Sequence, residues 1–533
     1  MAEKHYKGRV AAPGLALGPL FHLPDLAVAA DRPAGTPEAE MARLTAAIAA
    51  AREQLALLLA EGEEMAAEIL GFQLEMLDDP ALVETAAALV AEGAPAVRAW
   101  QEGLAPQVEV FAGDDDPYFR ARAADLLDLR DRVMAALAGG GGPAMAPPAG
   151  AIVTARDLSP SRFLGLDWAV LGGAALGAGS AASHVAMLAR ARGIPLVTAL
   201  GPIEPVAATA VLDARDGFLV VGPKPATERR YRGRLAVDRE EARAAAKVVA
   251  EPARTASGRP ISVMVNVDDP DAVPDDLLRA GDGVGLLRTE FLFIGRAERP
   301  DEETQYRAYA RLLQRLGGRP LILRTLDIGG DKPLPDLDIP AETNPFLGLR
   351  GLRLCLDRPE LFRPQVRAAL RAAADGPLSI MLPMVSRAAE VLEARSFIEA
   401  EARALDLAVP PVGIMVETPA AALALDTMPV DFASIGSNDL TQYVMAASRD
   451  AGGRVAELID PLDPAVLRLI RMVVEMAAAK GLPLSLCGDM ASDRAGIEAL
   501  VAIGIERVSV APAALGRVKL WIAGCAGRAH GLP

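Results

Sequence analysis

The second half of the chain repeats one pattern eight times: a short apolar run with the composition of a β-strand, then a longer amphipathic stretch with helical spacing. Strands separated by such helices run parallel and are covered by the helices. Eight repeats within roughly 270 residues predict a (β/α)8 TIM barrel, with a doubly wound open sheet as the structural alternative. From about residue 258 onward the runs are ISVMVNV, GVGLLR, LILRT, LSIMLPM, VGIMVE, FASIGS, LSLCG and RVSVAP.

The first half of the chain predicts a smaller α/β domain. Its β-like start, KGRVAAPGLALGPLF, is matched later by the short apolar runs GAIVTA, WAVLGG, IPLVTAL and GFLVVG, which alternate with short helical patterns. Between the start and these runs lies a segment rich in Ala, Leu and Glu at helical spacing, which ends at the turn-rich stretch GGGGPAMAPPAG. We therefore expect a helical bundle inserted within the α/β domain.

These patterns predict an α/β multidomain chain. The smaller α/β domain takes residues 1–35 and 143–223, and the inserted helical subdomain takes residues 36–142. A charged helical linker over residues 224–256 leads to the barrel over residues 257–533.

Composition and charge exclude several classes of protein. Hydrophobic residues make up 51% of the sequence and charged residues 23%, as in globular proteins. The formal net charge of −15 argues against nucleic acid as a partner, because binding to its backbone needs clustered Lys and Arg. No apolar run reaches the roughly 18 residues of a membrane span, and the N-terminal MAEKHYKGRV has no signal-peptide core. We expect no membrane insertion and a cytoplasmic location.

Polar side chains follow five of the predicted barrel strands. In a TIM barrel the chemistry lies at the C-terminal ends of the strands, where the βα loops meet, so we expect these side chains to share one mouth. They are Arg288, Arg324, Glu417, the pair Asn438 and Asp439, and Cys487.

The chemistry of these residues indicates a small phosphorylated acid as the substrate. Arg288 and Arg324 carry planar guanidinium groups that grip phosphate or carboxylate in bidentate fashion, and Arg449 offers a third cationic contact. Glu417 and Asp439 are hard oxygen ligands of the kind that hold Mg²⁺ together with substrate oxygens. The alternative is that the two arginines merely neutralise these two acids.

Two single residues have both a structural and a chemical interpretation. Cys487 is either a buried structural thiol or an acid that protonates the enolate left after loss of a phosphate. The stretch GSAASHVAMLAR places His184, one of only four histidines, between small residues and an expected helix start. The three cysteines are widely spaced, which predicts reduced thiols and no zinc site.

Six ordered motifs together resemble enzyme I of the bacterial phosphoenolpyruvate-dependent phosphotransferase system. The motifs are GVGLLRTEFLF, LRTLDIGGDKPLP, TNPFLGLRGLRL, GIMVETPAAA, SIGSNDLTQY and LCGDMASD, and the resemblance covers nearly the whole chain.

The resemblance implies a reaction, its partners and its residues. Phosphoenolpyruvate and a protein histidine give phosphohistidine and pyruvate in the presence of Mg²⁺, and the phosphoryl group passes to the carrier HPr as the first step of sugar transport. The first domain is then a phosphohistidine domain, the inserted helices dock HPr, and the barrel domain binds phosphoenolpyruvate and forms a homodimer. The resemblance implies that His184 is the phosphorylated histidine and that Cys487 is the acid that protonates enolpyruvate. It implies phosphoenolpyruvate ligands at Arg288, Arg324 and Arg449, with Asn438 and the backbone near Asp439 beside them. It also implies Mg²⁺ ligands at Glu417 and Asp439, and supporting charges at Lys332 and Arg350.

The chemistry of His184 agrees with that role. Neutral imidazole is a competent nucleophile near pH 7, and the N–H groups at a helix N-terminus favour an added phosphate. The sequence departs from the family in the loop just before His184, where Ala181 and Ala182 replace the Arg and Thr of the usual Gly-Gly-Arg-Thr-Ser-His. This departure motivates one alternative, a catalytically weakened scaffold that senses phosphoenolpyruvate. A second alternative is a paralogue that serves a nitrogen-regulatory carrier.

Overall fold

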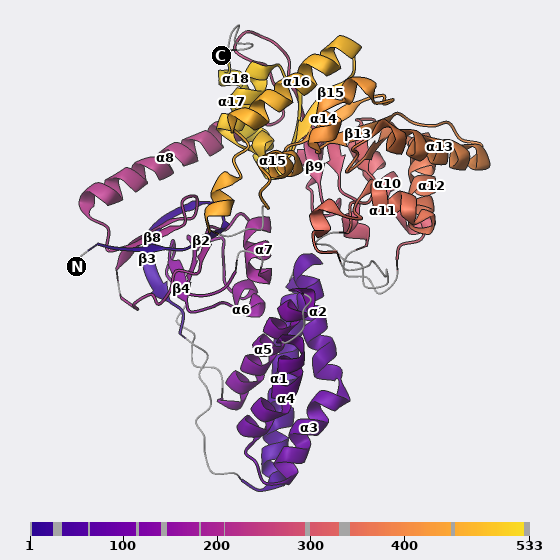
Figure 1. Ribbon diagram of the computed structural model, residues 1–533. Coiled ribbons are helices and arrows are strands. Elements are labelled where there is room, and N and C mark those ends of the chain that lie inside the picture. Colours follow the sequence, from indigo (N-terminus) through magenta and orange to yellow (C-terminus); the bar gives the residue numbers. More distant parts are fainter. Residues whose placement is uncertain are drawn as a thin grey trace. The chain divides into compact units, whose positions relative to one another are not determined.

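The computed structural model describes residues 3–24, 35–61, 64–112, 117–139, 147–180, 183–206, 208–293, 299–329, 342–448 and 453–526. The chain divides into two compact units, Met1–Asp238 and Arg239–Pro533 (Figure 1). Each unit buries its own apolar core. The two halves that differ in sequence pattern are thus two separately packed bodies.

The first unit is built on one mixed sheet. Within the described residues its strands run in the order β1-β8-β7-β3-β4-β5-β6-β2. Parallel pairing joins β3 to β4, β4 to β5 and β5 to β6, and the other neighbours pair antiparallel. The strands are β1 (Lys4–Lys7), β2 (Arg9–Ala12), β3 (Leu15–His22), β4 (Ile152–Ala155), β5 (Gly173–Leu176), β6 (Leu196–Thr198), β7 (Thr209–Asp213) and β8 (Phe218–Val221).

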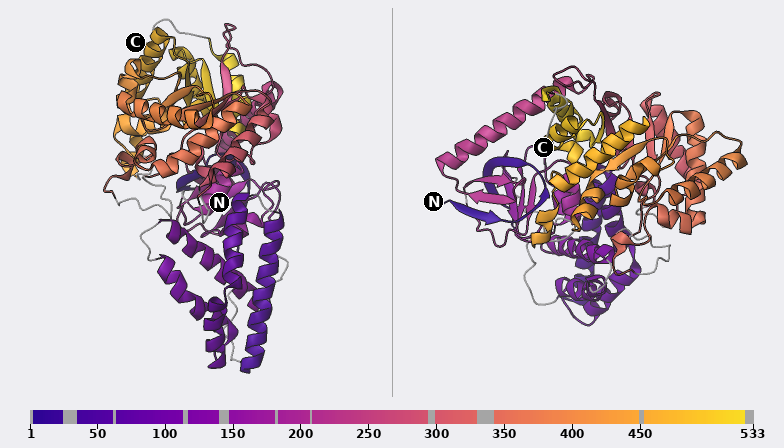
Figure 2. Two further views of the ribbon diagram at one scale, coloured as in Figure 1. Left: turned by 90° about the vertical axis from the view of Figure 1, so that its right-hand side faces the viewer. Right: turned by 45° about the horizontal axis from the view of Figure 1, so that its top comes forward.

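A helical bundle is inserted in the sequence between two strands, β3 and β4, that are neighbours in this sheet. Leu20 of β3 pairs directly with Ile152 of β4, although the whole helical segment lies between them in the chain. The inserted bundle expected from the sequence is therefore confirmed. Its helices are α1 (Pro37–Glu61), α2 (Glu64–Asp78), α3 (Pro80–Ala91), α4 (Ala96–Ala112) and α5 (Pro117–Leu137), which lie side by side in Figures 1 and 2.

The spacing of apolar residues explains why these segments form a bundle. In α1 the buried residues follow one another at intervals of three or four, which places them on one helical face, as with Leu44, Ala47, Ala51 and Leu55. Trp100 of α4 is completely buried in the same core.

The run WAVLGG is a turn rather than a strand, so that prediction was wrong. The side chain of Asp167 accepts a hydrogen bond from the Ala169 N–H, and its carbonyl accepts one from the Val170 N–H. These bonds fold the backbone into a turn that leaves Val170 exposed. The strand of this region, β5, begins only at Gly173. Two short helices complete the unit, α6 (Pro160–Leu164) and α7 (His184–Ala191).

The second unit is a closed barrel, which confirms the TIM-barrel prediction and shows the open-sheet alternative to be wrong. In the part of the chain that the structure describes, its eight strands pair in parallel around the ring in the order β10-β11-β12-β13-β14-β15-β16-β9. Each predicted run contains one of them. The strands are β9 (Ser262–Val267), β10 (Val284–Leu287), β11 (Leu321–Arg324), β12 (Leu378–Leu382), β13 (Val412–Val416), β14 (Ala433–Gly436), β15 (Leu484–Cys487) and β16 (Arg507–Val510).

Helices cover the outside of the barrel (Figure 2). The chain enters this unit through α8 (Pro225–Val248), within which the boundary between the two units falls. The barrel helices are α9 (Asp275–Ala280), α10 (Glu302–Leu316), α11 (Leu352–Asp357), α12 (Pro359–Asp375), α13 (Ala388–Leu405), α14 (Pro419–Leu423), α15 (Ser437–Met445), α16 (Pro464–Lys480), α17 (Arg494–Ile503) and α18 (Leu515–Gly524).

No helix among the described residues is long and apolar enough to cross a membrane.

Candidate active site

A pocket of about 200 Å³ opens where the C-terminal ends of the barrel strands meet. Polar residues at or after the ends of β10, β11, β13, β14 and β15 line it, because side chains at the ends of parallel strands converge on one mouth of the barrel. The structure therefore brings together seven of the residues singled out in the sequence: Arg288, Arg324, Arg350, Glu417, Asn438, Asp439 and Cys487.

Two of the three arginines are held in a buried network of carboxylates. Arg324 contacts Glu290 at 2.9 Å and Asp327 at 3.0 Å. Arg350 binds both oxygens of Asp327, at 2.9 and 3.0 Å, and also contacts Asp439 at 3.2 Å. Because these guanidinium groups are buried and fixed from several sides, they present charge in a set direction, as the binding of an anion requires.

Arg288 is held differently. Its side chain is about one-third exposed and contacts Asp268 at 2.7 Å. Among the described residues, neither Arg288 nor Arg324 forms an ion pair with Glu417 or Asp439. The simple alternative in which these two arginines neutralise those two acids is therefore not what the structure contains.

Glu417 directly follows β13 and is buried. Its Oε1 accepts a hydrogen bond of 2.6 Å from the Met384 N–H. Burial, together with the nearby carboxylates of Asp327 and Asp439, raises the pKa of Glu417 to about 8, although Arg324 opposes the shift. The Glu417 carboxyl therefore keeps its proton at neutral pH, and a cation bound there would displace that proton.

Cys487 is the last residue of β15 and is buried against Ser434, whose hydroxyl lies 3.7 Å from the sulfur. Burial raises the pKa of the Cys487 thiol, so the sulfur carries its proton at neutral pH. The same residue lines the pocket. Both sequence interpretations are compatible with this position, since the thiol is buried and also able to donate a proton into the pocket.

His184 lies in the first unit, at the start of α7. Ser183 is the N-cap residue, and its hydroxyl accepts a hydrogen bond from the Ala186 N–H at 3.2 Å. The helix therefore begins where the sequence indicated. The Nδ1 atom of His184 lies 3.2 Å from the Oδ1 atom of Asp125 in α5.

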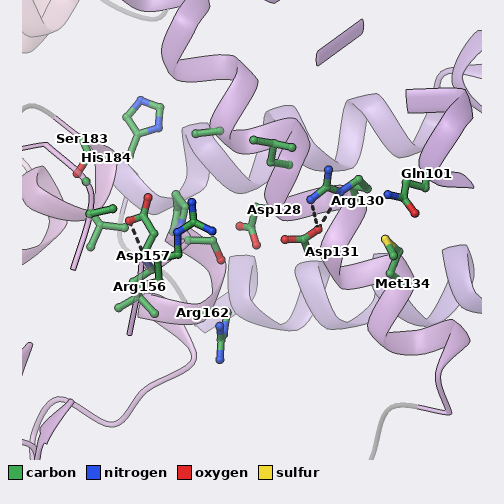
Figure 3. Close-up of a pocket in the computed structure, with 18 residues that line it drawn as sticks. Gln101, Asp128, Arg130, Asp131, Met134, Arg156, Asp157, Arg162, Ser183 and His184 are labelled. Atoms are coloured by element: carbon green, nitrogen blue, oxygen red, sulfur yellow. Dashed lines mark hydrogen bonds and ion pairs between the residues drawn. The ribbon is translucent and has the colours of Figure 1, made fainter. Parts of the chain in front are cut away.

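A cavity of about 610 Å³ adjoins His184 between the sheet domain and the inserted bundle. Figure 3 shows Ser183 and His184 at one end of it and Gln101 and Met134 at the other. Residues of α5, α6 and the loop after β4 form its walls. The imidazole is only 16% exposed, so a reacting group reaches it through this cavity.

Comparisons with known proteins follow the same division of the chain. Profiles of PEP-utilising enzymes match residues 7–122 (N-terminal), 147–217 (mobile domain) and 242–526 (PEP-binding domain). The phosphoenolpyruvate-protein phosphotransferase of Geobacillus stearothermophilus is 39% identical over 95% of this chain and 91% of its own length. This chain belongs to the phosphoenolpyruvate-protein phosphotransferase family. The relative from Bacillus subtilis is 37% identical over 95% of this chain and 91% of its own, and a multiphosphoryl transfer protein of Xanthomonas campestris is 38% identical over 98% of this chain and 64% of its own.

The residues at the barrel mouth fit a divalent cation bound jointly with a substrate. Within the described ranges no group of three or more His, Cys, Asp or Glu side chains is arranged to hold a metal. Glu417 and Asp439 supply only two carboxylates, which is the usual number when Mg²⁺ takes its other ligands from water and substrate oxygens. Both side chains line the same pocket, so a cation could contact the two carboxylates and a substrate together.

Four residues singled out in the sequence of this phosphotransferase lie outside the residues that the structure describes. Lys332, Arg449, Ala181 and Ala182 fall outside the described residues.

Glu290 and Asp327 were missed although they hold Arg324 and Arg350. Both lie within quoted motifs, as RTE and RTLD, a few positions after the predicted strand-end arginines. An acidic residue just behind a strand-end arginine was the signal that could have identified them.

We expect Gly488→Ala to lower the stability of the barrel by about 2–4 kcal/mol, as the sum of left-handed backbone strain and steric overlap. Gly488 has φ 110°, and an added Cβ would overlap the Ser437 hydroxyl. The midpoint of thermal unfolding measures the change. Gly481→Ala is the matched control, since that glycine has φ 63° with open space around it. Equal losses in the two variants would refute the steric argument.

Proposed function

We propose that this protein transfers the phosphoryl group of phosphoenolpyruvate to its own His184 and then to an HPr-type carrier, as the first step of sugar phosphotransferase transport. The observation that carries the proposal is the barrel mouth, where three arginines converge with three carboxylates and a protonated thiol: Arg288, Arg324 and Arg350 with Asp327, Glu417, Asp439 and Cys487. Family membership supports phosphoenolpyruvate as the substrate.

The substrate would bind through its two anionic groups. Phosphate and carboxylate both accept paired hydrogen bonds from guanidinium groups, and the pocket offers three of these. Asn438, held by reciprocal hydrogen bonds with Asp489, adds a neutral polar contact at the rim. Lys332 and Arg449, which lie outside the described residues, are proposed as further cationic contacts. Mg²⁺, held by Glu417 and Asp439, would neutralise charge on the phosphate.

The chemical step needs one nucleophile and one acid. His184 forms the N–P bond while the P–O bond to the enol oxygen breaks, so the electron pair of that bond stays with the enolate. The Cys487 thiol then gives its proton to the terminal carbon of the enolate, which yields pyruvate. The step requires His184 to reach the barrel mouth.

Incubation with labelled phosphoenolpyruvate and Mg²⁺ tests the proposal. We expect one acid-labile, alkali-stable phosphoryl group per chain and one pyruvate released with it, because phosphohistidine is stable to alkali and lost in acid. Pyruvate released without any bound label, or no label at all, would contradict the proposal.

Cys487→Ala is expected to slow isotope exchange between pyruvate and phosphoenolpyruvate by about 100-fold or more, the usual contribution of a positioned acid. Removal of the thiol deletes the proton donor, whereas phosphoryl transfer to His184 does not itself consume that proton. Cys355→Ala is the matched control, because Cys355 is equally buried but does not line the pocket. Exchange that is unchanged in Cys487→Ala, or equally slow in both variants, would assign Cys487 to a structural role.

The inserted bundle is proposed as the docking surface for the carrier. The acids Glu53, Glu75, Asp79, Glu84 and Glu92 are exposed on α1, α2 and α3 and in the turns that follow α2 and α3. We expect transfer from the labelled protein to purified HPr to slow by about tenfold or more between low salt and half-molar salt, since salt screens attraction to a basic carrier. Transfer that ignores salt, or that proceeds only to a nitrogen-regulatory carrier, would contradict this proposal.

A homodimer through the barrel unit is also proposed. Leu423 of α14 and Met472 of α16 are exposed apolar residues on two helices that pack together. Such residues gain stability when a second copy covers them. Sedimentation velocity over a range of protein concentrations should show dimers that Leu423→Lys weakens. A chain that stays monomeric at all concentrations would refute this proposal.

A further inference from the structure

We propose that Asp125 is a positioning residue for His184: its carboxylate holds the proton on Nδ1 and leaves Nε2 as the nucleophile. This inference rests on the proposed role of His184 as the acceptor of the phosphoryl group. It identifies α5 of the inserted bundle, rather than the sheet domain alone, as part of the phosphoryl-acceptor site.

The geometry of the pair carries the argument. The Asp125 side chain is completely buried, and its Oδ1 lies 3.2 Å from Nδ1 of His184. A carboxylate oxygen accepts hydrogen bonds, so this contact favours the tautomer in which Nδ1 is the donor. A neutral imidazole that carries its proton on Nδ1 has its free lone pair on Nε2.

The helix that presents Asp125 is anchored one turn further on. Asp128 accepts hydrogen bonds from the Ser161 hydroxyl at 2.7 Å, the Ser161 N–H at 3.1 Å and Gln73 Nε2 at 3.0 Å. Gln73 Nε2 also donates to the backbone carbonyl of Asp125 at 3.2 Å. These contacts tie α5 to α2 and to α6, so the Asp125 carboxylate is fixed and orients the ring rather than following it.

The same pair also matters for the charge of the product. When Nε2 bonds to phosphorus while Nδ1 keeps its proton, the ring gains one positive charge as the P–O bond of phosphoenolpyruvate breaks. No proton leaves the imidazole in this step. The adjacent carboxylate stabilises the cationic ring, as an Asp does for the imidazolium of a Ser-His-Asp triad.

The tautomer can be read directly by nitrogen NMR. The chain has only four histidines, so ¹⁵N-histidine labelling of the full protein gives few signals, and His184→Ala assigns the one of interest. We expect neutral His184 to be protonated at Nδ1 in the wild type. In Asp125→Asn, whose amide can donate to Nδ1, the proton should shift to Nε2 in a large fraction of molecules.

The rate of phosphorylation should follow the tautomer. We expect Asp125→Asn to take up label from phosphoenolpyruvate about 100-fold more slowly or worse, with unchanged affinity of the barrel for phosphoenolpyruvate. Asp128→Asn is the structural control: it weakens the anchoring of α5 without touching His184, so thermal stability should fall while Nδ1 keeps its proton.

The outcomes separate this inference from the proposed function. Suppose that the wild type takes up label, and that Asp125→Asn takes it up at the same rate and keeps the same His184 tautomer. Asp125 then has only a structural role, and this inference fails while the proposed function stands. The inference is also overturned if neutral wild-type His184 carries its proton on Nε2. A wild type that takes up no label at all overturns the proposed function instead, and this inference with it.

Discussion

Replacement of His184 by alanine is expected to reduce acid-labile labelling from phosphoenolpyruvate by at least about a thousandfold, because the nucleophile itself is lost. Alanine has no nitrogen that could form the N–P bond. Affinity for phosphoenolpyruvate should stay unchanged, since its proposed site lies in the other unit. Labelling and equilibrium binding, measured on the same preparation, check both parts.

His22→Ala provides a matched control in the same unit. His22 is an exposed histidine at the end of β3 whose ring contacts the hydroxyl of Thr154, and it does not line the cavity beside His184. We expect this variant to take up label as the wild type does. Normal labelling of His184→Ala, or loss of label in both variants, would contradict the proposal that His184 accepts the phosphoryl group.

The two arginines Arg324 and Arg288 are expected to respond differently to replacement by methionine. Each change should weaken phosphoenolpyruvate binding by about 10- to 100-fold, because a hydrogen bond to a charged group contributes about 1.5–3 kcal/mol. Arg324→Met should also destabilise the barrel by about 3–5 kcal/mol, since it leaves the buried carboxylates of Glu290 and Asp327 without their partner. Arg288→Met should leave stability nearly unchanged, because its ion pair with Asp268 is at the surface.

Substrate titrations and thermal unfolding of both variants separate binding from folding. Arg288→Met is the informative variant for binding, because its fold should stay intact. Full affinity in Arg288→Met would exclude this side chain as a substrate ligand. Equal stability of the two variants would show that the buried network around Arg324 contributes little.

The barrel and much of its mouth could be predicted from the sequence for a physical reason. A parallel strand buried on both faces appears as an uninterrupted apolar run, and its C-terminal end projects the next side chain into the mouth. Arg288, Arg324, Glu417 and Cys487 could therefore be placed by their positions directly at or after such runs. The prediction for WAVLGG failed because Asp167 forms a turn that an apolar pattern does not reveal.

The partners of the predicted residues could not be deduced in the same way. Asp125 meets His184 only because the bundle folds back against the sheet domain, and nothing in the spacing of the two residues indicates this contact. Likewise, the link between Arg350 and Asp439 joins the segment just before α11 to the first turn of α15, which are far apart in the sequence. Periodicity identifies elements and their ends, whereas contacts between elements depend on how they pack.

The location of the phosphoryl group tests the central claim most directly. The protein is incubated with phosphoenolpyruvate and Mg²⁺, digested at alkaline pH to preserve phosphohistidine, and mapped by mass spectrometry. We predict a single phosphate on the peptide that contains His184, attached to the imidazole and absent when phosphoenolpyruvate is omitted. A phosphate on any other residue, or a wild-type chain that carries none, would contradict the account.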